Sequence, residues 1–505
     1  MEFQIPSFLI LFSCLILTLI IWKKINKDSN PPPGPWKFPL LGNIPQLLRG
    51  LPHESLRDLA KIYGSVMSIQ QGQIPAVVFS SVETANQVLK IQGDLFSERP
   101  RLLSREIASY NYMDMASAPY GDYWRQIRKI TTLQFLSPKR ILSFQSVREE
   151  QISNFIKLLG SKEGSSVNLP RIISDLIDNI FLITILGKNG ESEQTILPML
   201  ENMQKEVIAG IASDLFPSLK FLLDFLSGAK SRMQKVHKDT DNVLEDIINE
   251  HRNQTSFGDN FLDLLLNQQK NGEREFPLTN QSIKANILQM FGARKTAFKA
   301  LEGSIAELMK NPKVMRKAQE EVRRVFGEKG KVEESRIQEL KYLKSVIKET
   351  LRLHPPITFI FRQCKERTKI MGYDIRPKTT IMVNAWAIGR DPIVWNEPEK
   401  FYPERFEDSQ IDYRGGNMEL IPFGAGKRIC PAITLAITYV ELLLANLLYH
   451  FDWKLPDGIT PANLDMTEIF HGTFKRKEHL NMIPIPFSPL SQDQAKKITS
   501  SEFME

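Results

Sequence analysis

The stretch Pro422–Ala432, "PFGAGKRICPA", decides the fold of this 505-residue chain. It places Cys430, one of only three cysteines, behind two glycines and two cations. Gly424 and Gly426 permit a tight turn, and an apolar helix is expected over Ala432–Tyr449. Because the amides and dipole of a helix N-terminus stabilise negative charge, the position of Cys430 favours a thiolate.

The chemistry of this loop suits a metal-bearing, flat cofactor. A thiolate is a soft and strongly donating ligand. The glycines let a planar group lie close to the backbone, and Lys427 and Arg428 can neutralise carboxylates. This combination favours a haem with a cysteine axial ligand and propionates nearby. A buried structural thiol is the alternative interpretation of the loop taken alone.

Two further motifs place charged groups on helix faces. "KETLR" sets Glu349 and Arg352 at i and i+3, so they can pair on one face, and "YPERF" adds Arg405. "YWRQIRK" puts Trp124 and Arg128 on one face of a helix. A solvated ion pair, which contributes little stability, is the alternative for the charged set.

Together and in this order, these motifs resemble the cytochrome P-450 superfamily. The loop is similar to the family pattern FxxGxRxCxG, "KETLR" to ExxR, "PERF" at Pro403–Phe406 to the motif of that name, and "WRQIR" to WxxxR. The likeness extends over essentially the whole chain. "PPPGPWKFPLLGNIPQL" and "LKYLKSVIKETLRLHPP" look like plant microsomal members, especially those that oxidise terpenoids.

The resemblance implies a fold, a cofactor and partners. The fold would be α+β, mainly α, with haem b between a long central helix and the cysteine loop. Cys430 would be the metal ligand, and electrons would come from an NADPH-dependent cytochrome P-450 reductase. The other cofactor-binding residues would be Trp124, Arg128, Arg362, Phe423, Gly426 and Arg428. Glu349, Arg352 and Arg405 would form a folding and haem-retention network. Arg125, Lys129 and Lys427 are candidate cations for docking the reductase, with simple solubility as the alternative.

The oxygen-binding motif of the long helix departs from the family pattern A/G-G-x-D/E-T-T/S. Read as one residue short, "MFGARKTAFKALEGS" (Met290–Ser304) puts Arg294 in place of the glycine and Lys295 in place of the acid. Thr296 then matches the catalytic threonine. A buried cation is costly unless it is paired. The side chains could therefore turn away, pair with an anion, or abolish oxygen activation; a local reading-frame error is a fourth explanation. Ala432 also stands where the loop pattern has glycine, which could crowd the ligand loop.

The N-terminus predicts a membrane anchor. Phe8–Trp22 carries no charge, and Lys23, Lys24 and Lys27 follow it, which keeps the downstream part cytoplasmic. A cleaved signal peptide is the alternative, but it favours a basic start. We expect an anchor over 1–22, a basic and proline-rich linker over 23–36, and a catalytic domain over 37–505. The location would be the endoplasmic reticulum membrane, single-pass, with the domain on the cytoplasmic face.

The body reads as mostly helical with a minor sheet. We expect a strand at "AVVFSS" (Ala76–Ser81), a long helix over Val207–Phe225, and another from a Thr279 or Asn280 cap to Asn311, where Pro312 stops it. By family position, substrate contacts would come from five mostly apolar segments: Leu102–Ala118, Val207–Phe216, Gln289–Thr296, Ile357–Phe361 and Ile469–Phe474.

Three functions remain open from the sequence. The first is a monooxygenase that hydroxylates or epoxidises a lipophilic plant secondary metabolite, a terpenoid, with Thr296 as the catalytic residue. The second is a haem enzyme of the same fold that does not activate O2, such as an isomerase, a dehydratase or a peroxide-using enzyme. The third is a non-catalytic paralogue. The formal charge of +7 is mild for this length and suits a membrane face or an acidic protein; no nucleic acid partner is expected.

Overall fold

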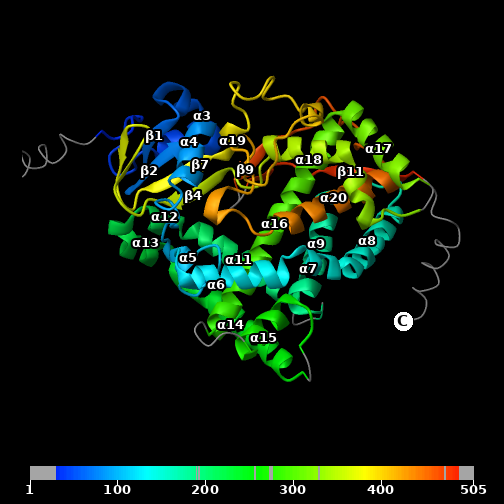
Figure 1. Cartoon of the computed structure of the whole chain (residues 1–505), viewed down its shortest axis with the longest axis horizontal. Coiled ribbons are helices and arrows are strands. Elements are labelled where there is room, and N and C mark those ends of the chain that lie inside the picture. Colours follow the sequence, from blue (N-terminus) through cyan, green and yellow to red (C-terminus); the bar gives the residue numbers. More distant parts are fainter. Residues whose placement is uncertain are drawn as a thin grey trace, which may run out of the picture.

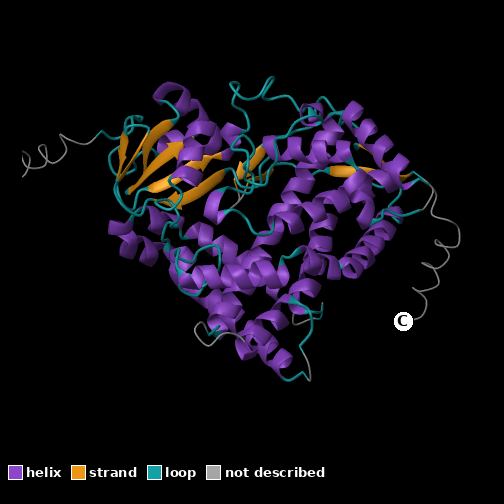
Figure 2. Ribbon diagram, viewed as in Figure 1, coloured by secondary structure: helices purple, strands orange, loops and turns teal. Residues whose placement is uncertain are grey.

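The computed structural model describes residues 30–188, 190, 194–254, 257–271, 277–327, 330–470 and 474–487. A helical body and a smaller sheet-bearing end make up these residues, with the sheet at the left in Figures 1 and 2. The expected α+β, mainly α, fold is confirmed. The predicted anchor at 1–22 lies outside the described residues.

The main sheet has the strand order β1-β2-β7-β4. Its strands are β1 (Val66–Gln71), β2 (Ile74–Phe79), β7 (Thr380–Asn384) and β4 (Phe359–Gln363). The strand predicted at "AVVFSS" falls in β2, which pairs antiparallel with β1 and parallel with β7. β4 pairs antiparallel with β7, and this pairing holds the segment 359–363 at the edge of the cavity described below.

The long central helix is α16 (Asn280–Lys310). The Thr279 side chain accepts a hydrogen bond from the Ser282 amide, and Pro312 opens α17 (Pro312–Phe326). The predicted cap and stop are therefore confirmed, because proline suits the first turn of a helix but not its interior. α16 packs against α9 (Leu169–Leu186), α18 (Lys341–Leu353) and α20 (Ile433–His450).

The prediction of one helix over Val207–Phe225 is wrong. The chain forms α11 (Ile196–Ala209), α12 (Ile211–Leu215), a 3₁₀ turn η3 (Pro217–Leu219) and α13 (Lys220–Ser227). Gly210 ends the first of these helices, and Pro217, which has no N–H, forces another break. These two breaks divide the segment that the sequence suggested as one continuous helix.

The remaining elements complete the body. The helices are α2 (Ile44–Leu47), α3 (Pro52–Tyr63), α4 (Val82–Asn86), α5 (Leu103–Ala108), α6 (Asp122–Ile130), α7 (Pro138–Ser143), α8 (Gln145–Gly160), α14 (Ala229–Arg252), α15 (Phe261–Asn271) and α19 (Ala385–Ile388). Short π turns, η1 (Gln87–Ile91) and η2 (Thr131–Phe135), extend α4 and α6; 3₁₀ turns are η4 (Glu334–Glu339), η5 (Pro403–Phe406) and η6 (Gly426–Arg428). The small sheets use β3 (Val167–Asn168), β5 (Thr368–Ile370), β6 (Tyr373–Ile375), β8 (Phe451–Lys454), β9 (Glu468–Phe470), β10 (Phe474–Arg476) and β11 (Asn481–Pro486).

Among the described residues, α20 is the one helix long and apolar enough to cross a membrane. Most of its hydrophobic window is buried inside the protein, and it packs against α16, α17 and α18. These contacts make α20 a core helix, and it carries the Cys430 loop at its N-terminal end.

Candidate functional site

Cys430 lies between η6 and the start of α20. Its amide donates to the Phe423 carbonyl at 3.0 Å, which closes the loop into a tight turn. Gly424 has φ 74°, a left-handed conformation that glycine adopts readily because it has no Cβ. Ala432, the residue that could have crowded the loop, has φ −96°. An alanine fits that conformation without strain, so the departure from glycine at this position is harmless.

Gly426 lies where the cysteine loop meets η1. It has φ 68°, and a Cβ at this position would lie 1.9 Å from the carbonyl oxygen of Leu89 in η1. It does not line the cavity next to Cys430. Gly426 lets the loop lie against η1 and so helps to position Cys430; its assignment as a cofactor contact stays a prediction.

A cavity of about 510 Å³ lies between α16 and the Cys430 loop. The structure brings most of the predicted site residues to its wall, although they come from distant parts of the chain. These are Trp124, Arg128, Thr296, Arg362, Phe423, Arg428 and Cys430. Gly426 is the predicted member that stays outside.

Arginine side chains crowd one side of this cavity. Arg428 donates to the carbonyls of Ser97 (3.0 Å) and Ala118 (2.7 Å), and its guanidinium lies 4.4 Å from the Trp124 ring centroid. Its Nη1 is buried with no hydrogen-bond partner among the described residues. Arg128 donates to the Ile429 carbonyl at 2.8 Å, next to the cysteine.

Arg99 belongs to the same cluster and was missed in the sequence. It donates to the Phe361 carbonyl at 2.6 Å, while its Nε is buried and has no partner among the described residues. Arg362 donates to the same carbonyl at 2.8 Å. Nothing in the local sequence "SERPR" separates Arg99 from a surface cation, because the groups it meets are more than 250 residues away in the chain.

Within the described residues, Arg99, Arg362 and Arg428 form no direct ion pair, although the charges of Glu98 and Asp114 act on the cluster. Burial, together with the charge of the neighbouring Arg428, lowers the pKa of Arg362 to about 9. Burial also lowers the pKa of Arg428 to about 10 and takes that of Arg99 well below its usual value. Buried cations with free N–H groups require an anionic partner. The carboxylates of a porphyrin fit this donor set.

Cys430 lines the same cavity as these cations. Burial raises the pKa of the Cys430 thiol, and the Ala432 amide and the charge of Arg128 oppose that rise. A metal ion displaces the thiol proton and uses the sulfur as a soft ligand. The residues present therefore fit a haem with Cys430 as axial ligand.

The α16 face of the cavity shows how the altered motif is arranged. Ala293, Thr296, Ala297 and Ala300 line the wall, at the spacing of one helix face. The Thr296 hydroxyl donates to the Ala293 carbonyl at 2.7 Å. Ala293, and not Arg294, therefore occupies the glycine position, and the motif "GARKTA" (292–297) aligns without a gap. The expectation that Arg294 replaces the glycine is wrong.

Both cations of this motif turn away from the cavity. Arg294 is 2% exposed and pairs with Asp178 on α9. Lys295 donates to Gln204 on α11 at 3.0 Å. The first of the four explanations considered for these residues therefore holds. Three departures from the family pattern remain: Ala293 replaces the second glycine, Lys295 replaces the acid, and Ala297 replaces the hydroxyl residue after the threonine.

The predicted network around Glu349 is present and lies outside the cavity. Arg352 contacts both carboxylate oxygens of Glu349, at 2.7 and 2.8 Å, and Arg405 contacts one of them at 3.0 Å. Arg352 also donates to the carbonyls of Gly389 and Pro398, both at 2.6 Å. A buried, fully bonded set of this kind fixes loops in place, which agrees with the structural role expected for it.

The predicted substrate segments are only partly brought to the cavity. Members of three line it: Arg105, Met115 and Ala116; Gln289, Met290, Ala293 and Thr296; and Ile357 with Phe359–Phe361. No residue of Val207–Phe216 is in the wall among the residues that the structure describes. The side chains at 470–475 lie outside the described set, so the expectation for Phe470 and Phe474 is not addressed.

The three candidate docking cations differ in their surroundings. Arg125 pairs with Asp122 at 2.6 Å, and Lys427 pairs with Asp94. Lys129 forms no ion pair within the described part of the chain. These two pairs reduce the positive charge that the face carrying α6 and the loop can present to an acidic protein.

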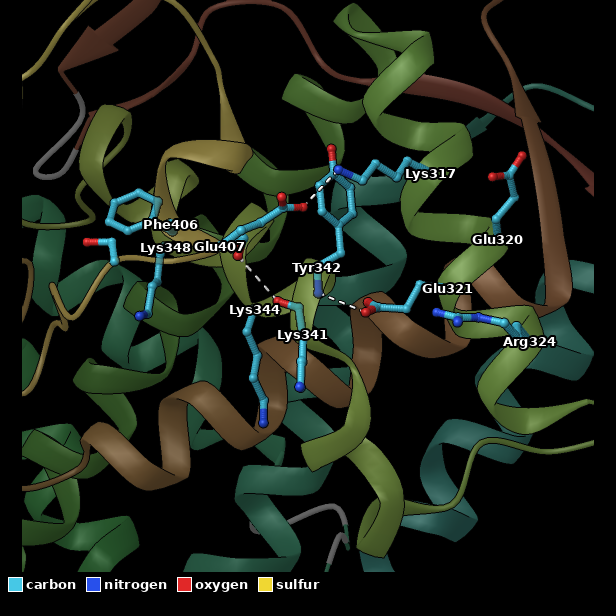
Figure 3. Close-up of a pocket in the computed structure, with 12 residues that line it drawn as sticks. Lys317, Glu320, Glu321, Arg324, Lys341, Tyr342, Lys344, Lys348, Phe406 and Glu407 are labelled. Carbon is cyan, nitrogen blue, oxygen red and sulfur yellow. Dashed lines mark hydrogen bonds and ion pairs between the residues drawn. The ribbon is translucent and has the colours of Figure 1, made fainter.

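A larger groove, of about 730 Å³, lies on α17 and α18 (Figure 3). Its walls mix charges: Lys317 pairs with Glu407 at 2.8 Å, and Glu321 accepts from the Tyr342 amide at 2.8 Å. Glu321 thereby caps the N-terminus of α18. Because the groove includes neither Cys430 nor any residue of α16, it is separate from the candidate site.

The comparisons with known proteins agree with this geometry. Residues 31–480 match the family described as Cytochrome P450. "Cytochrome P450 726A27" of Euphorbia lathyris is 56% identical over 97% of this chain and 99% of its own length. "Premnaspirodiene oxygenase" of Hyoscyamus muticus is 43% identical (97% and 99%), and "Tabersonine 6,7-epoxidase isoform 1" of Catharanthus roseus 44% (96% and 98%). A zebra fish cytochrome P450 solved with progesterone has a TM-score of 0.75 at 23% identity, over 86% of this chain and 99% of that one.

Proposed function

Because this chain belongs to the cytochrome P450 family and is a monooxygenase, we propose that it hydroxylates or epoxidises a lipophilic plant terpenoid with O2 and electrons from an NADPH-dependent reductase. The observation that carries the proposal is the cavity lined by Cys430 and by arginines, of which Arg99 and Arg428 each have a buried N–H group without a partner among the described residues. When bound there, a haem with a thiolate ligand supplies the activation of O2.

The residues of the chain have separate tasks in this proposal. Arg99, Arg128, Arg362 and Arg428 would hold the haem carboxylates, with Trp124 packed against Arg428. Thr296 would position the water that brings protons. Its Oγ1 donates to the Ala293 carbonyl, so its lone pairs are free to accept a hydrogen bond from the cavity side.

The cavity wall favours a neutral terpenoid over an amine. Its substrate side is largely apolar, with Met115, Ile357, Phe359 and Phe361, which suits a hydrophobic ligand. None of the described residues that line it is acidic. A protonated alkaloid nitrogen would have no carboxylate to pair with among the described residues of the wall. The terpenoid class therefore takes precedence over the alkaloid class named for one relative.

The support for the alternative function, a haem enzyme that does not activate O2, is weakened by the structure. It rested on two cations in the oxygen groove, and both turn outward to partners on α9 and α11. The missing acid at position 295 removes one proton relay group but leaves Thr296 at the wall. No observation favours a non-catalytic paralogue.

Membrane attachment is also part of the proposal. Phe221 and Phe225 on α13 are 87% and 77% exposed, and Leu222 and Leu226 beside them are also exposed. Neighbouring exposed apolar side chains of this kind mark an interaction surface. Together with the predicted N-terminal anchor, it suits a domain resting on the cytoplasmic face of the endoplasmic reticulum membrane. Lys129, which forms no ion pair with any described residue, is the remaining candidate for reductase docking.

The test is microsomal co-expression with a plant NADPH reductase. The reduced carbon monoxide spectrum reports the thiolate-ligated haem, and products are scored with and without NADPH on terpene hydrocarbons and on tabersonine. We expect NADPH-dependent terpene oxidation, lost in Cys430→Ser. Product formation without NADPH, or turnover confined to tabersonine, would contradict the proposal.

A further inference from the structure

The segment between α5 and α6 contains an unusual backbone turn. Tyr110, Asn111 and Tyr112 have φ values of 49°, 61° and 62°, although none is glycine. Each such residue costs about 1 kcal/mol or more. The Asn111 amide donates to the Glu106 carbonyl at 2.8 Å, and the Tyr112 amide donates to Ser109 Oγ at 3.0 Å. The turn directs residues 113–116, which we call the strap, toward α16.

Asn286 of α16 holds the strap by its backbone. Its Oδ1 accepts from the Met115 amide at 3.1 Å, and its Nδ2 donates to the Met113 carbonyl at 3.1 Å. The same Nδ2 donates to the Ser282 carbonyl at 2.7 Å, which fixes the rotamer of the side chain. Asn286 is 1% exposed, so these backbone groups have no water to replace it.

The strap forms part of the cavity wall. Met115 and Ala116 both line it. The Met115 carbonyl accepts from Trp124 Nε1 at 3.0 Å, and the Met113 carbonyl accepts from the Tyr123 hydroxyl at 2.5 Å. The strap is thus pinned between α16 on one side and α6, which carries Trp124, on the other.

We propose that Asn286 is a positioning residue that sets the cavity wall at Met115 and so selects which carbon of the substrate is oxidised. The inference rests on the proposed function for its substrate, but the wall itself is independent of the reaction. An amide is required because the strap presents one donor and one acceptor to the same side chain. Loss of either bond leaves a buried backbone group unpaired. The strap can then shift, because its movement relieves the backbone strain of the turn at 110–112.

The first experiment measures the wall without turnover. Imidazole and ketoconazole, a small and a bulky azole, are titrated into the haem-loaded protein and followed by the shift of the Soret band. In Asn286→Leu we expect the ketoconazole dissociation constant to change about fivefold or more, the equivalent of one hydrogen bond. That of imidazole stays within about twofold, because it does not reach the wall. Gln281→Leu, an exposed amide on the same helix, is the matched control and should change neither.

The second experiment tests whether Asn286 acts through Met115. In a double-mutant cycle, Asn286→Leu added to Met115→Ala should change the ketoconazole affinity and the terpene product ratio no further than Met115→Ala alone. Fully additive effects would overturn the inference, as would equal shifts for both azoles in Asn286→Leu. If Asn286→Leu retains no haem, Asn286→Asp, which keeps the acceptor for the Met115 amide, is used in its place under the same criteria. If wild-type protein oxidises no terpene while the azole pattern holds, the substrate class fails and the positioning role stands.

Discussion

Arg294 on α16 and Asp178 on α9 form a buried ion pair on the side of α16 that faces away from the Cys430 cavity. Arg294 also donates to the Phe291 carbonyl at 2.8 Å. Burial raises the pKa of Asp178, and the guanidinium beside it opposes that rise. The cation that the sequence placed in the oxygen groove therefore joins two core helices.

Replacing Arg294 should affect stability and not chemistry. Arg294→Gly or Arg294→Met leaves Asp178 without its partner, which costs about 3 kcal/mol of unfolding free energy. Product turnover per haem should stay within about twofold, because the side chain does not reach the cavity. Thermal unfolding and product assays on haem-loaded protein measure the two effects. The double variant Arg294→Met/Asp178→Leu should recover most of the stability, and a large gain in turnover in Arg294→Gly would contradict the placement.

Some features of α16 could be predicted from the sequence and others could not. The helix, its Thr279 cap and its stop at Pro312 follow from local rules, and the structure has them. The helical spacing of 293, 296, 297 and 300 was also present in the sequence, and it would have excluded Arg294 from the wall. The partner of Arg294 was not predictable, because nothing local indicates that α9 brings an acid to this helix.

Gly426 makes the same point for the cysteine loop. The motif position of Gly426 was predicted, but the need for glycine there comes from a contact with Leu89, more than 300 residues earlier in the chain. Long-range backbone approach of this kind leaves no pattern in the sequence except the glycine itself. The same holds for Arg99, which only the assembled cavity identifies as a site residue.

Adding one methyl group at Gly426 should therefore cost the haem. In Gly426→Ala the new Cβ would meet the Leu89 carbonyl oxygen at 1.9 Å in a left-handed conformation, so either the loop or η1 must move. We expect the fraction of protein showing the thiolate-type carbon monoxide band to fall at least about tenfold, since strain of this kind exceeds 1.4 kcal/mol. Gly416→Ala, an exposed position with nothing within 4 Å of its Cβ, is the control. Normal haem content in Gly426→Ala would refute the packing argument.

Arg99 should hold haem without tuning the sulfur. Arg99→Met removes a cation whose Nε lacks a partner among the described residues. The rate of haem transfer to apomyoglobin should rise about tenfold, the equivalent of one charge-assisted hydrogen bond. The position of the carbon monoxide band should not change, because Arg99 does not contact Cys430. Arg101→Met, an exposed neighbour, should leave the transfer rate unchanged; an equal effect there would assign the result to the surface charge.

Glu441 on α20 should make the protein less stable as the pH rises. Burial raises the pKa of this carboxyl to about 7, and Lys344 on α18 and Arg414 oppose the rise. Tyr413 adjoins the same site. Because the folded pKa lies above the unfolded value, the unfolded chain loses this proton first. Stability is therefore fully present below about pH 4.5 and is lost as the pH rises toward 7.

Glu441→Gln should remove this dependence by keeping a neutral side chain at every pH. Relative to wild type, the variant should be near neutral at pH 5 and more stable at pH 8, by about 1–3 kcal/mol after allowance for the partial exposure of the group. The measurement is the thermal unfolding midpoint of haem-loaded protein at one scan rate across this range. Glu150→Gln, an exposed glutamate on α8, should show no such trend. A variant that follows the wild-type pH profile would mean that Lys344 and Arg414 keep Glu441 ionised throughout, and that burial of α20 carries no carboxylate cost.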